Sequence, residues 1–221
     1  MIQRPGKIVC VGRNYREHAK ELGNEVPAEP LIFLKPPSSV IGDGEAIVLP
    51  RVSSQVEFEG EIGIVVGKTL RAADEYDATN AIRGIVAVND VTARDLQKTD
   101  GQWTRAKGFD TFCAVSNEVA AVRDLGAIEV RTRVNGVEKQ RARATEMVFS
   151  IPKILSYISQ IMTLEPGDLI ATGTPAGVGR LSPGDTVDID LVDTSSGARG
   201  KPLVSISNPV VGSAVPTPAP R

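Results

Sequence analysis

The chain has few of the residue types that usually carry zinc, disulfide or cofactor chemistry. Its 221 residues include one histidine, two cysteines and one tryptophan. Cys10 and Cys113 lie far apart in the sequence, and neither belongs to a Cys-x-x-Cys pair or lies near a group of histidines. Structural zinc sites and disulfide frameworks need such groups. We therefore predict that both cysteines are buried, reduced thiols that pack as small apolar side chains.

The chain also lacks an excess of charge of either sign and any long apolar run. It carries 25 Lys and Arg against 27 Asp and Glu, a net charge of -2, so no basic field favours nucleic acid or anionic lipid. Apolar runs such as Ile62–Val66 are far shorter than the roughly 20 residues of a membrane span. Ile8–Val11, near the start, is too short for a secretory signal. These absences predict a cytoplasmic protein with neither nucleic acid nor membrane as a partner.

Glycine and proline, with 21 and 15 residues, fall regularly between short apolar segments. This spacing predicts a fold rich in short strands. No strand-helix-strand unit of about thirty residues repeats along the chain, which argues against a doubly wound sheet. The expected strands are Lys7–Val11, Leu31–Lys35, Ala46–Leu49, Glu57–Val66, Arg83–Asn89, Phe112–Val115, Ile128–Val134, Asp168–Thr172, Thr186–Leu191 and Leu203–Ser207.

Three segments carry helix signals, each with a polar residue suited to cap its N-terminus. The third also has an apolar stripe that we interpret as core packing. The expected helices are Tyr15–Leu22 with Asn14 as N-cap and Gly23 beyond its end, a helix that follows Thr92 with Thr92–Asp95 as its capping box, and Ile151–Met162 with Ser150 as N-cap.

The end of the chain differs in composition from the rest. Residues 209–221 contain Pro209, Pro216, Pro218 and Pro220 among small side chains. Such a segment buries too little apolar surface to offset the entropy of ordering it. We predict one catalytic domain over residues 1–208, followed by a disordered Pro/Ala-rich tail over residues 209–221.

Acidic residues gather at two places. Glu57, Glu59 and Glu61 alternate along a predicted strand, so they share one face. That face is either solvated or, since the strand continues into apolar residues, partly buried around a cation. Asp90 ends another apolar run, either as a turn residue or as a third ligand. A set of Glu59, Glu61 and Asp90, with no nitrogen or sulfur ligand, would suit Mg²⁺ or Mn²⁺ rather than Zn²⁺.

The single histidine lies on the first predicted helix. His18 and Glu21 are three residues apart, so their side chains can touch. The pair is either a general base oriented by a carboxylate or an exposed pair of little consequence. Spacing alone leaves both interpretations open.

Cationic and polar residues farther along could hold an anion. Arg94 and Gln97 lie one turn apart on the second predicted helix, and Lys107 precedes a strand. They either bind an anionic substrate or are ordinary surface residues. The glycine-rich segment Gly173–Gly179 follows a strand, and its backbone donors and the Thr174 hydroxyl could hold a carboxylate. It is not a phosphate-binding P-loop, because no Gly-Lys-Ser/Thr follows.

Taken in order, these features resemble the fumarylacetoacetate hydrolase family, and most of all its short acylpyruvate hydrolase and oxaloacetate decarboxylase branch. The resemblance covers about Lys7 to Pro209, and it includes the segment Val9–Tyr15 ahead of His18. Two departures are Glu57-Phe58, where an Asp-Tyr pair is expected, and Gly60 between the metal ligands, where a bulkier residue is usual. Glu57 is therefore left out of the metal shell.

The resemblance implies a mainly β (α+β) fold, a mixed β-sandwich or β-roll with a few peripheral helices, and a homodimer. It also implies a role for each candidate residue. The implied roles are metal ligation by Glu59, Glu61 and Asp90 with Mg²⁺ or Mn²⁺ as cofactor, catalysis by His18, Glu21, Lys107 and Gln97, and substrate binding by Arg94, Thr174 and Gly173.

The implied activity is Mg²⁺-dependent hydrolysis of the carbon-carbon bond of small β-diketo acids, such as acylpyruvates, to pyruvate and a carboxylic acid. His18 would activate the attacking water. Decarboxylation or keto-enol tautomerisation of oxaloacetate, which pass through a similar enolate, are alternatives. Isomerisation or hydration of an aromatic-degradation intermediate is another. A catalytically silent protein that binds a metal or a dicarboxylate is the non-enzymatic alternative.

Overall fold

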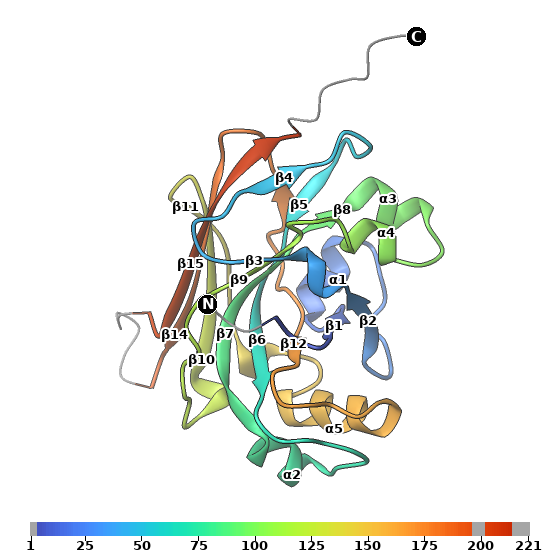
Figure 1. Cartoon of the computed structure of the whole chain (residues 1–221), viewed down its shortest axis with the longest axis vertical. Coiled ribbons are helices and arrows are strands. Elements are labelled where there is room, and N and C mark those ends of the chain that lie inside the picture. The colour runs from blue at the N-terminus through green and yellow to red at the C-terminus, as the bar shows by residue number, and fades with distance from the viewer. Residues whose placement is uncertain (1–3, 196–201, 214–221) are drawn as a thin grey trace.

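The computed structural model describes residues 4–195 and 202–213. Two β-sheets pack against each other and form the centre of the described fold, with short helices around them (Figure 1). The larger sheet is mixed, because β1 runs parallel to β12 and β3 runs parallel to β9. Its seven strands, in spatial order, are β2 (Leu31–Lys35), β1 (Ile8–Gly12), β12 (Leu169–Ala171), β6 (Gly60–Val66), β7 (Ile82–Asp90), β9 (Cys113–Val115) and β3 (Val40–Ile41).

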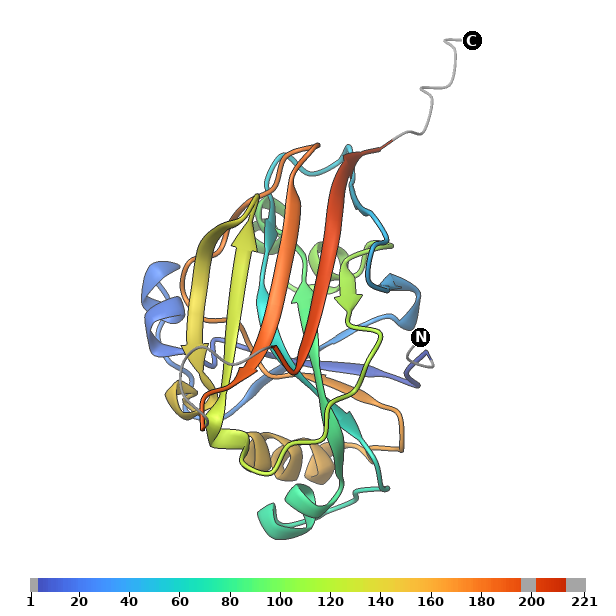
Figure 2. The same ribbon diagram turned by 90° about the vertical axis from the view of Figure 1, so that its left-hand side faces the viewer.

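Figure 2 shows the second sheet from its outer face. It is antiparallel except that its edge strand β4 runs parallel to β15. Its five strands, in spatial order, are β11 (Val137–Arg143), β10 (Ile128–Val134), β14 (Thr186–Asp193), β15 (Val204–Gly212) and β4 (Ile47–Leu49), and a small third sheet consists of β13 (Gly179–Arg180), β5 (Val56–Phe58) and β8 (Thr92–Ala93). The predicted mixed β architecture is confirmed.

Short helices lie at the periphery of the sheets. Helices α1, α3 and α4 lie on the side away from the five-stranded sheet, and α2 and α5 lie together at one end (Figure 1). Their bounds are α1 (Arg16–Glu21), α2 (Glu75–Asn80), α3 (Arg94–Thr99), α4 (Thr104–Lys107) and α5 (Ile151–Ile161), with single 3₁₀ turns at Pro37–Ser39, Leu125–Ala127 and Ala144–Glu146. None of these helices, within the described part of the chain, is long and apolar enough to cross a membrane.

Strands β6 and β7 are buried on both faces, which accounts for their nearly continuous apolar sequence. On one face, Ile62 and Ile64 belong to the main core that the five-stranded sheet completes. On the other face, Val86 and Val88 pack in a second cluster with Cys113. Both cysteines are free and buried, as predicted, and burial raises the pKa of Cys113 to about 12.

The predicted strand Glu57–Val66 is interrupted at Glu59. The chain changes sheet there, since β5 pairs with β8 and β13 whereas β6 pairs with β7 and β12. Side chains take the two backbone donors at the break: Asn89 Oδ1 accepts from Glu59 N at 3.0 Å, and Gln140 Oε1 accepts from Gly60 N at 3.0 Å. This change of sheet aims the carboxylates on either side of the break into one cavity.

Two of the predicted helix starts are wrong. Helix α1 is capped by Tyr15, because the Asn14 side chain instead joins Phe149 and Thr172. Thr92 caps no helix: it lies in β8, and its hydroxyl donates to Asp90 O at 2.9 Å. The predicted cap of α5 is confirmed, since Ser150 Oγ accepts from Lys153 N.

The last described strand runs into the segment predicted as a tail. Strand β15 continues through Gly212, because Val210 and Val211 pair with β4 and Val210 N donates to Asp185 O at 2.8 Å. Pro209, which has no N–H, is exposed and sits opposite Thr186 near the end of the β14 ladder. The predicted disorder of residues 209–212 is therefore wrong, and residues 214–221 lie outside the described residues.

Candidate active site

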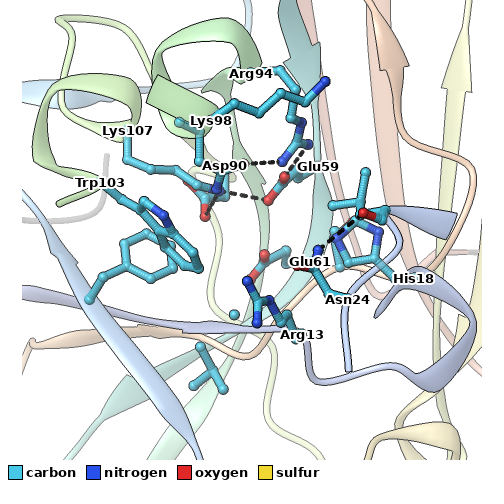
Figure 3. Close-up of a pocket in the computed structure, with 16 residues that line it drawn as sticks. Arg13, His18, Asn24, Glu59, Glu61, Asp90, Arg94, Lys98, Trp103 and Lys107 are labelled. Carbon is cyan, nitrogen blue, oxygen red and sulfur yellow. Dashed lines mark hydrogen bonds and ion pairs between the residues drawn. The ribbon is translucent and has the colours of Figure 1, made fainter. Parts of the chain in front are cut away.

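A cavity of about 300 Å³ opens where the ends of β1, β6 and β7 meet helices α1, α3 and α4. Figure 3 shows its lining, with Glu59, Glu61 and Asp90 at the centre. His18 lines it from α1, and Lys107 lines it from α4. The structure thus brings together both of the acidic segments and the histidine that the sequence singled out.

The three predicted ligands are close together and buried. Glu59, Glu61 and Asp90 each offer a carboxylate oxygen, and these oxygens lie within 4.8 Å of one another. All three residues are at most 4% exposed. Each lies at a junction: Glu59 between β5 and β6, Glu61 near the start of β6, and Asp90 at the end of β7.

Arg94 holds the two glutamates that precede the break in the strand. Its Nε donates to Glu57 Oε2 at 2.8 Å, and its Nη2 donates to Glu59 Oε1 at 2.5 Å. Its Nη1 donates to Gln97 Oε1 at 2.6 Å. Glu57 is therefore an ion-pair partner of Arg94. Each nitrogen of the guanidinium that was predicted to bind substrate thus already donates to a neighbouring side chain.

Two buried lysines hold Asp90. Lys107 Nζ lies 2.7 Å from both Glu59 Oε2 and Asp90 Oδ2. Lys35 Nζ lies 2.6 Å from Asp90 Oδ1 and also donates to Val91 O. Burial alone would raise the pKa of Glu59, but Lys107 and Arg94 hold it well below its usual range.

Glu61 has no cationic partner among the described residues. Its one hydrogen bond is from Gly173 N to Oε2, at 2.8 Å. Burial, reinforced by Asp90 and Glu59, raises the pKa of Glu61 well above its usual range. A carboxylate that is buried beside two others and lacks a counter-charge is typical of a ligand that needs a cation to ionise. Three oxygen donors of this kind fit Mg²⁺ or Mn²⁺.

The histidine and its carboxylate partner face the cavity from α1. His18 Nδ1 lies 3.2 Å from Glu21 Oε2, and His18 is 4% exposed. Glu21 also accepts from Gly177 N at 3.0 Å, so this bond ties α1 to the glycine-rich segment. Since a carboxylate only accepts, Nδ1 carries the proton of the neutral ring, which leaves Nε2 to accept or return a proton.

The glycine-rich segment makes hydrogen bonds that hold the site together, whether or not it also contacts substrate. Gly173 N is taken by Glu61, and Thr174 Oγ1 donates to Gly60 O at 3.0 Å. Gln140 Nε2 in turn donates to Thr174 Oγ1 at 2.7 Å. Thr174 still lines the cavity. Substrate binding by Gly173, Thr174, Arg94 and Gln97 remains a prediction.

Sequence reasoning missed several residues of the site. Lys35 ends an apolar strand, so nothing in its surroundings along the chain marked it as a partner of Asp90. Gln140 lies on β11, a charged strand that the pattern did not predict. Arg13 belongs to the segment Val9–Tyr15, and the structure places it in the lining of the cavity. Its backbone φ of 58° could not be predicted from the sequence.

Comparisons with known proteins agree with this geometry. The family model described as fumarylacetoacetate (FAA) hydrolase C-terminal matches residues 7–211. An oxaloacetate decarboxylase of Dictyostelium discoideum is 46% identical over 188 residues, which cover 82% of this chain and 86% of that protein. An oxaloacetate tautomerase of Arabidopsis thaliana is 44% identical and covers 88% and 90% of the two chains.

A solved structure agrees as well. The crystal structure of a 2-hydroxyhepta-2,4-diene-1,7-dioate isomerase from Mycobacterium marinum superimposes with a TM-score of 0.83 at 44% identity, covering 96% of this chain and 77% of that one. The resemblance drawn from the sequence is thereby confirmed. The chain belongs to the fumarylacetoacetate hydrolase family.

Proposed function

We propose that the protein acts on small 2-oxo acids of the oxaloacetate type and interconverts their keto and enol forms, with decarboxylation as a second outcome of the same enolate. The observation that carries the proposal is the cavity that holds the His18–Glu21 pair and the three buried carboxylates together. The names of two relatives, an oxaloacetate decarboxylase and an oxaloacetate tautomerase, support this substrate.

Each residue of the cavity has a task in such a reaction. Glu59, Glu61 and Asp90 would hold Mg²⁺ or Mn²⁺, which when bound supplies Lewis-acid stabilisation of negative charge on a substrate oxygen. His18 Nε2 takes the proton from C3 of the keto acid while the C–H electron pair forms the C2–C3 double bond, and a proton from solvent completes the enol at the C2 oxygen. In the reverse direction the oxygen loses its proton and His18 returns one to C3. Glu21 stabilises the imidazolium formed in between. Arg94 and Lys107 hold Glu59 in place by ion pairs, and Lys107 does the same for Asp90.

Hydrolysis of acylpyruvates is the second candidate. The His18–Glu21 pair favours it, because such a pair can also activate water. That reaction needs donors for the oxyanion formed when water attacks the distal carbonyl. The resemblance assigns this task to Lys107 together with Gln97, and Lys107 already donates to Glu59 and Asp90. Proton transfer at C3 develops negative charge on the C2 oxygen and needs no donor at a distal carbonyl, so the geometry favours tautomerisation.

The test follows three reactions of the purified protein in Mg²⁺ buffer and in EDTA. These are loss of the ultraviolet absorbance of enol-oxaloacetate, pyruvate release from oxaloacetate, and pyruvate release from acetylpyruvate. We expect EDTA-sensitive ketonisation to have the largest kcat/KM. A larger kcat/KM for acetylpyruvate would overturn the proposal in favour of hydrolysis. If the protein turned over none of the three substrates, a catalytically silent binding protein would be favoured.

Variants of α1 test the role of the histidine pair. His18→Gln should lower ketonisation by roughly a hundredfold or more, as expected for loss of a general acid-base group. Glu21→Gln should lower it less. Glu17→Gln is the matched control, because Glu17 is an exposed glutamate on the same helix. Equal rates for His18→Gln and the native protein would show that another group moves the proton.

A further inference from the structure

The cavity holds cations that the carboxylate cluster does not use. Four of its lining side chains are Arg or Lys: Arg13, Arg94, Lys98 and Lys107. Arg94 and Lys107 are paired with Glu57, Glu59 and Asp90. Arg13 and Lys98 have no hydrogen-bond or ion-pair partner in the part of the chain that the structure describes. These two are therefore the cations available to an anionic group of a substrate.

Arg13 is held in place by its backbone. Its φ of 58° lies in the left-handed region, which L residues other than Asn and Asp rarely adopt. The residues on both sides are fixed: Gly12 pairs with Leu31 in the sheet, and the Asn14 side chain accepts from Phe149 N and donates to Thr172 O, each at 2.8 Å. The strained conformation is therefore imposed by long-range contacts, and residues held in this way cluster at ligand sites.

The position of Arg13 complements the cluster. Figure 3 shows Arg13 on the side of the carboxylates opposite Arg94. It is half-buried, whereas Lys98 is exposed on α3. A guanidinium also presents paired donors that match both oxygens of a carboxylate. Of the two available cations, Arg13 is thus the one whose direction and chemistry suit a fixed anion.

We propose that Arg13 binds the distal carboxylate of the substrate, the one not attached to the 2-oxo carbon, and so selects dicarboxylic over monocarboxylic 2-oxo acids. This inference rests on the proposed function and adds the substrate class to it. Oxaloacetate has such a distal carboxylate, whereas an acylpyruvate with an alkyl acyl group has an uncharged group at that end.

The same contact bears on the choice between the two outcomes of the reaction. In decarboxylation the bond between C3 and C4 breaks, its electron pair moves into the enolate, and C4 leaves as neutral CO₂. A guanidinium on that carboxylate stabilises the charged reactant more than the transition state, in which the charge has moved away. In tautomerisation the carboxylate keeps its charge throughout. Arg13 therefore favours tautomerisation over decarboxylation.

Binding of inert ligands tests the contact without turnover. L-malate and L-lactate differ by the distal carboxylate, and titration calorimetry in Mg²⁺ buffer gives the dissociation constant of each. We expect the native protein to prefer malate by roughly ten- to a hundredfold, as for one charge-assisted pair. Arg13→Asn should abolish this preference. It suits the left-handed backbone and should therefore fold.

Three further variants complete the test. Arg13→Lys should keep part of the preference, and Arg16→Asn, which removes a neighbouring exposed charge, should keep all of it. The proposal is overturned if native protein binds the two acids equally, if Arg13→Asn keeps the preference, or if Lys98→Gln removes it. Arg13→Asn should also raise the ratio of pyruvate release to ketonisation on oxaloacetate. A malate preference that depends on Arg13, in a protein without ketonisation activity, would refute the proposed function alone.

Discussion

Asp90 has each of its carboxylate oxygens held by a different lysine, and neither lysine side chain is more than 2% exposed. Ion pairs buried this deeply add little to the free energy of unfolding, because the cost of removing the charges from water offsets much of their attraction. The removal of one lysine is different, because it leaves one oxygen of the buried carboxylate without its partner. The lysines thus fix the direction of the Asp90 side chain more than they stabilise the fold.

Lys35→Met tests this at the residue scale. It keeps the length of the side chain and leaves Asp90 Oδ1 and Val91 O without their donor. We expect a loss of about 3 kcal/mol in the free energy of unfolding, measured by urea denaturation. Lys20→Met, at an exposed position on α1, should change it by less than about 0.5 kcal/mol. Equal values for the two variants would contradict the buried pair.

At the scale of elements, Gln140 joins the two sheets at the site. From β11 it accepts from Gly60 N, between Glu59 and Glu61, and donates to Thr174 Oγ1 and Pro175 O. A Cβ at Gly60 would lie 1.9 Å from Thr132 Oγ1, so Gly60 has to be glycine for the sheets to approach this closely. The unusual glycine between the ligands therefore has a packing reason.

Gln140→Leu should destabilise the protein by roughly 1–3 kcal/mol, because it leaves buried polar groups without partners. It should also weaken Mg²⁺ binding in calorimetric titration, since Gly60 lies between two ligands. Gln140→Glu, which keeps the acceptor for Gly60 N, should retain more of the affinity. Lys139→Leu, at the exposed neighbouring position, is the control and should leave Mg²⁺ affinity unchanged.

The start of α3 is tied to the turn before β5 by Asp95, which accepts from Ser53 Oγ, Ser54 N and Ser54 Oγ. Desolvation would raise the pKa of Asp95, but these hydrogen bonds lower it to about 2. The pKa of Asp95 is thus lower in the folded protein than the value of about 3.9 in the unfolded chain, so the ionised carboxylate stabilises the fold above about pH 3.9. This stabilisation is lost as the pH falls towards 2. The free energy of unfolding, measured by urea denaturation, should therefore fall less between pH 4 and pH 2 in Asp95→Asn than in the native protein. Asp110→Asn, at an exposed position, should match the native profile.

Elements that are marked by a local pattern of apolar and polar residues were predictable from the sequence. The strands Leu31–Lys35 and Ile128–Val134 have the predicted bounds, because their apolar pattern is local. Strand β11 was not predicted, since most of its side chains are exposed and charged, and Gln140 and Ala142 alone face inward. The cap of α1 was also wrong, because Asn14 bonds to residues 135 and 158 positions away.

The residues of the site also divide into those that the sequence could identify and those that it could not. Glu59, Glu61, Asp90, His18 and Glu21 could be found because their residue types and order carry the chemistry. The pairing of Lys35 with Asp90, 55 residues away, could not. Nor could the engagement of Arg94 by Glu57 and Glu59, because spacing along the chain says nothing about which carboxylate a guanidinium meets.

At the scale of the whole molecule, a bound divalent cation should stabilise the fold. Mg²⁺ at a hundred times its dissociation constant should add about 2.7 kcal/mol, seen as a higher melting temperature that EDTA reverses. Glu61→Gln should abolish the Mg²⁺-dependent rise. Glu118→Gln, at an exposed position, should keep it. A rise that survives in Glu61→Gln would place the cation elsewhere.

The predicted homodimer is open to a direct measurement. Light scattering should give twice the chain mass of 23.4 kDa. A value of one chain mass would contradict the predicted homodimer.

The pairing of β1 with β12 has a consequence for how the protein is made. Ile8 lies beside Leu169, and the Lys7 side chain bonds to Asp168, so one of the two neighbours of the first strand is synthesised about 160 residues later. Closing so long a loop is slow, and contacts of high sequence separation delay folding. During translation, His18 and Asp90 therefore leave the ribosome well before the cavity that they line can form. The larger sheet becomes continuous only when β12 lies between β1 and β6.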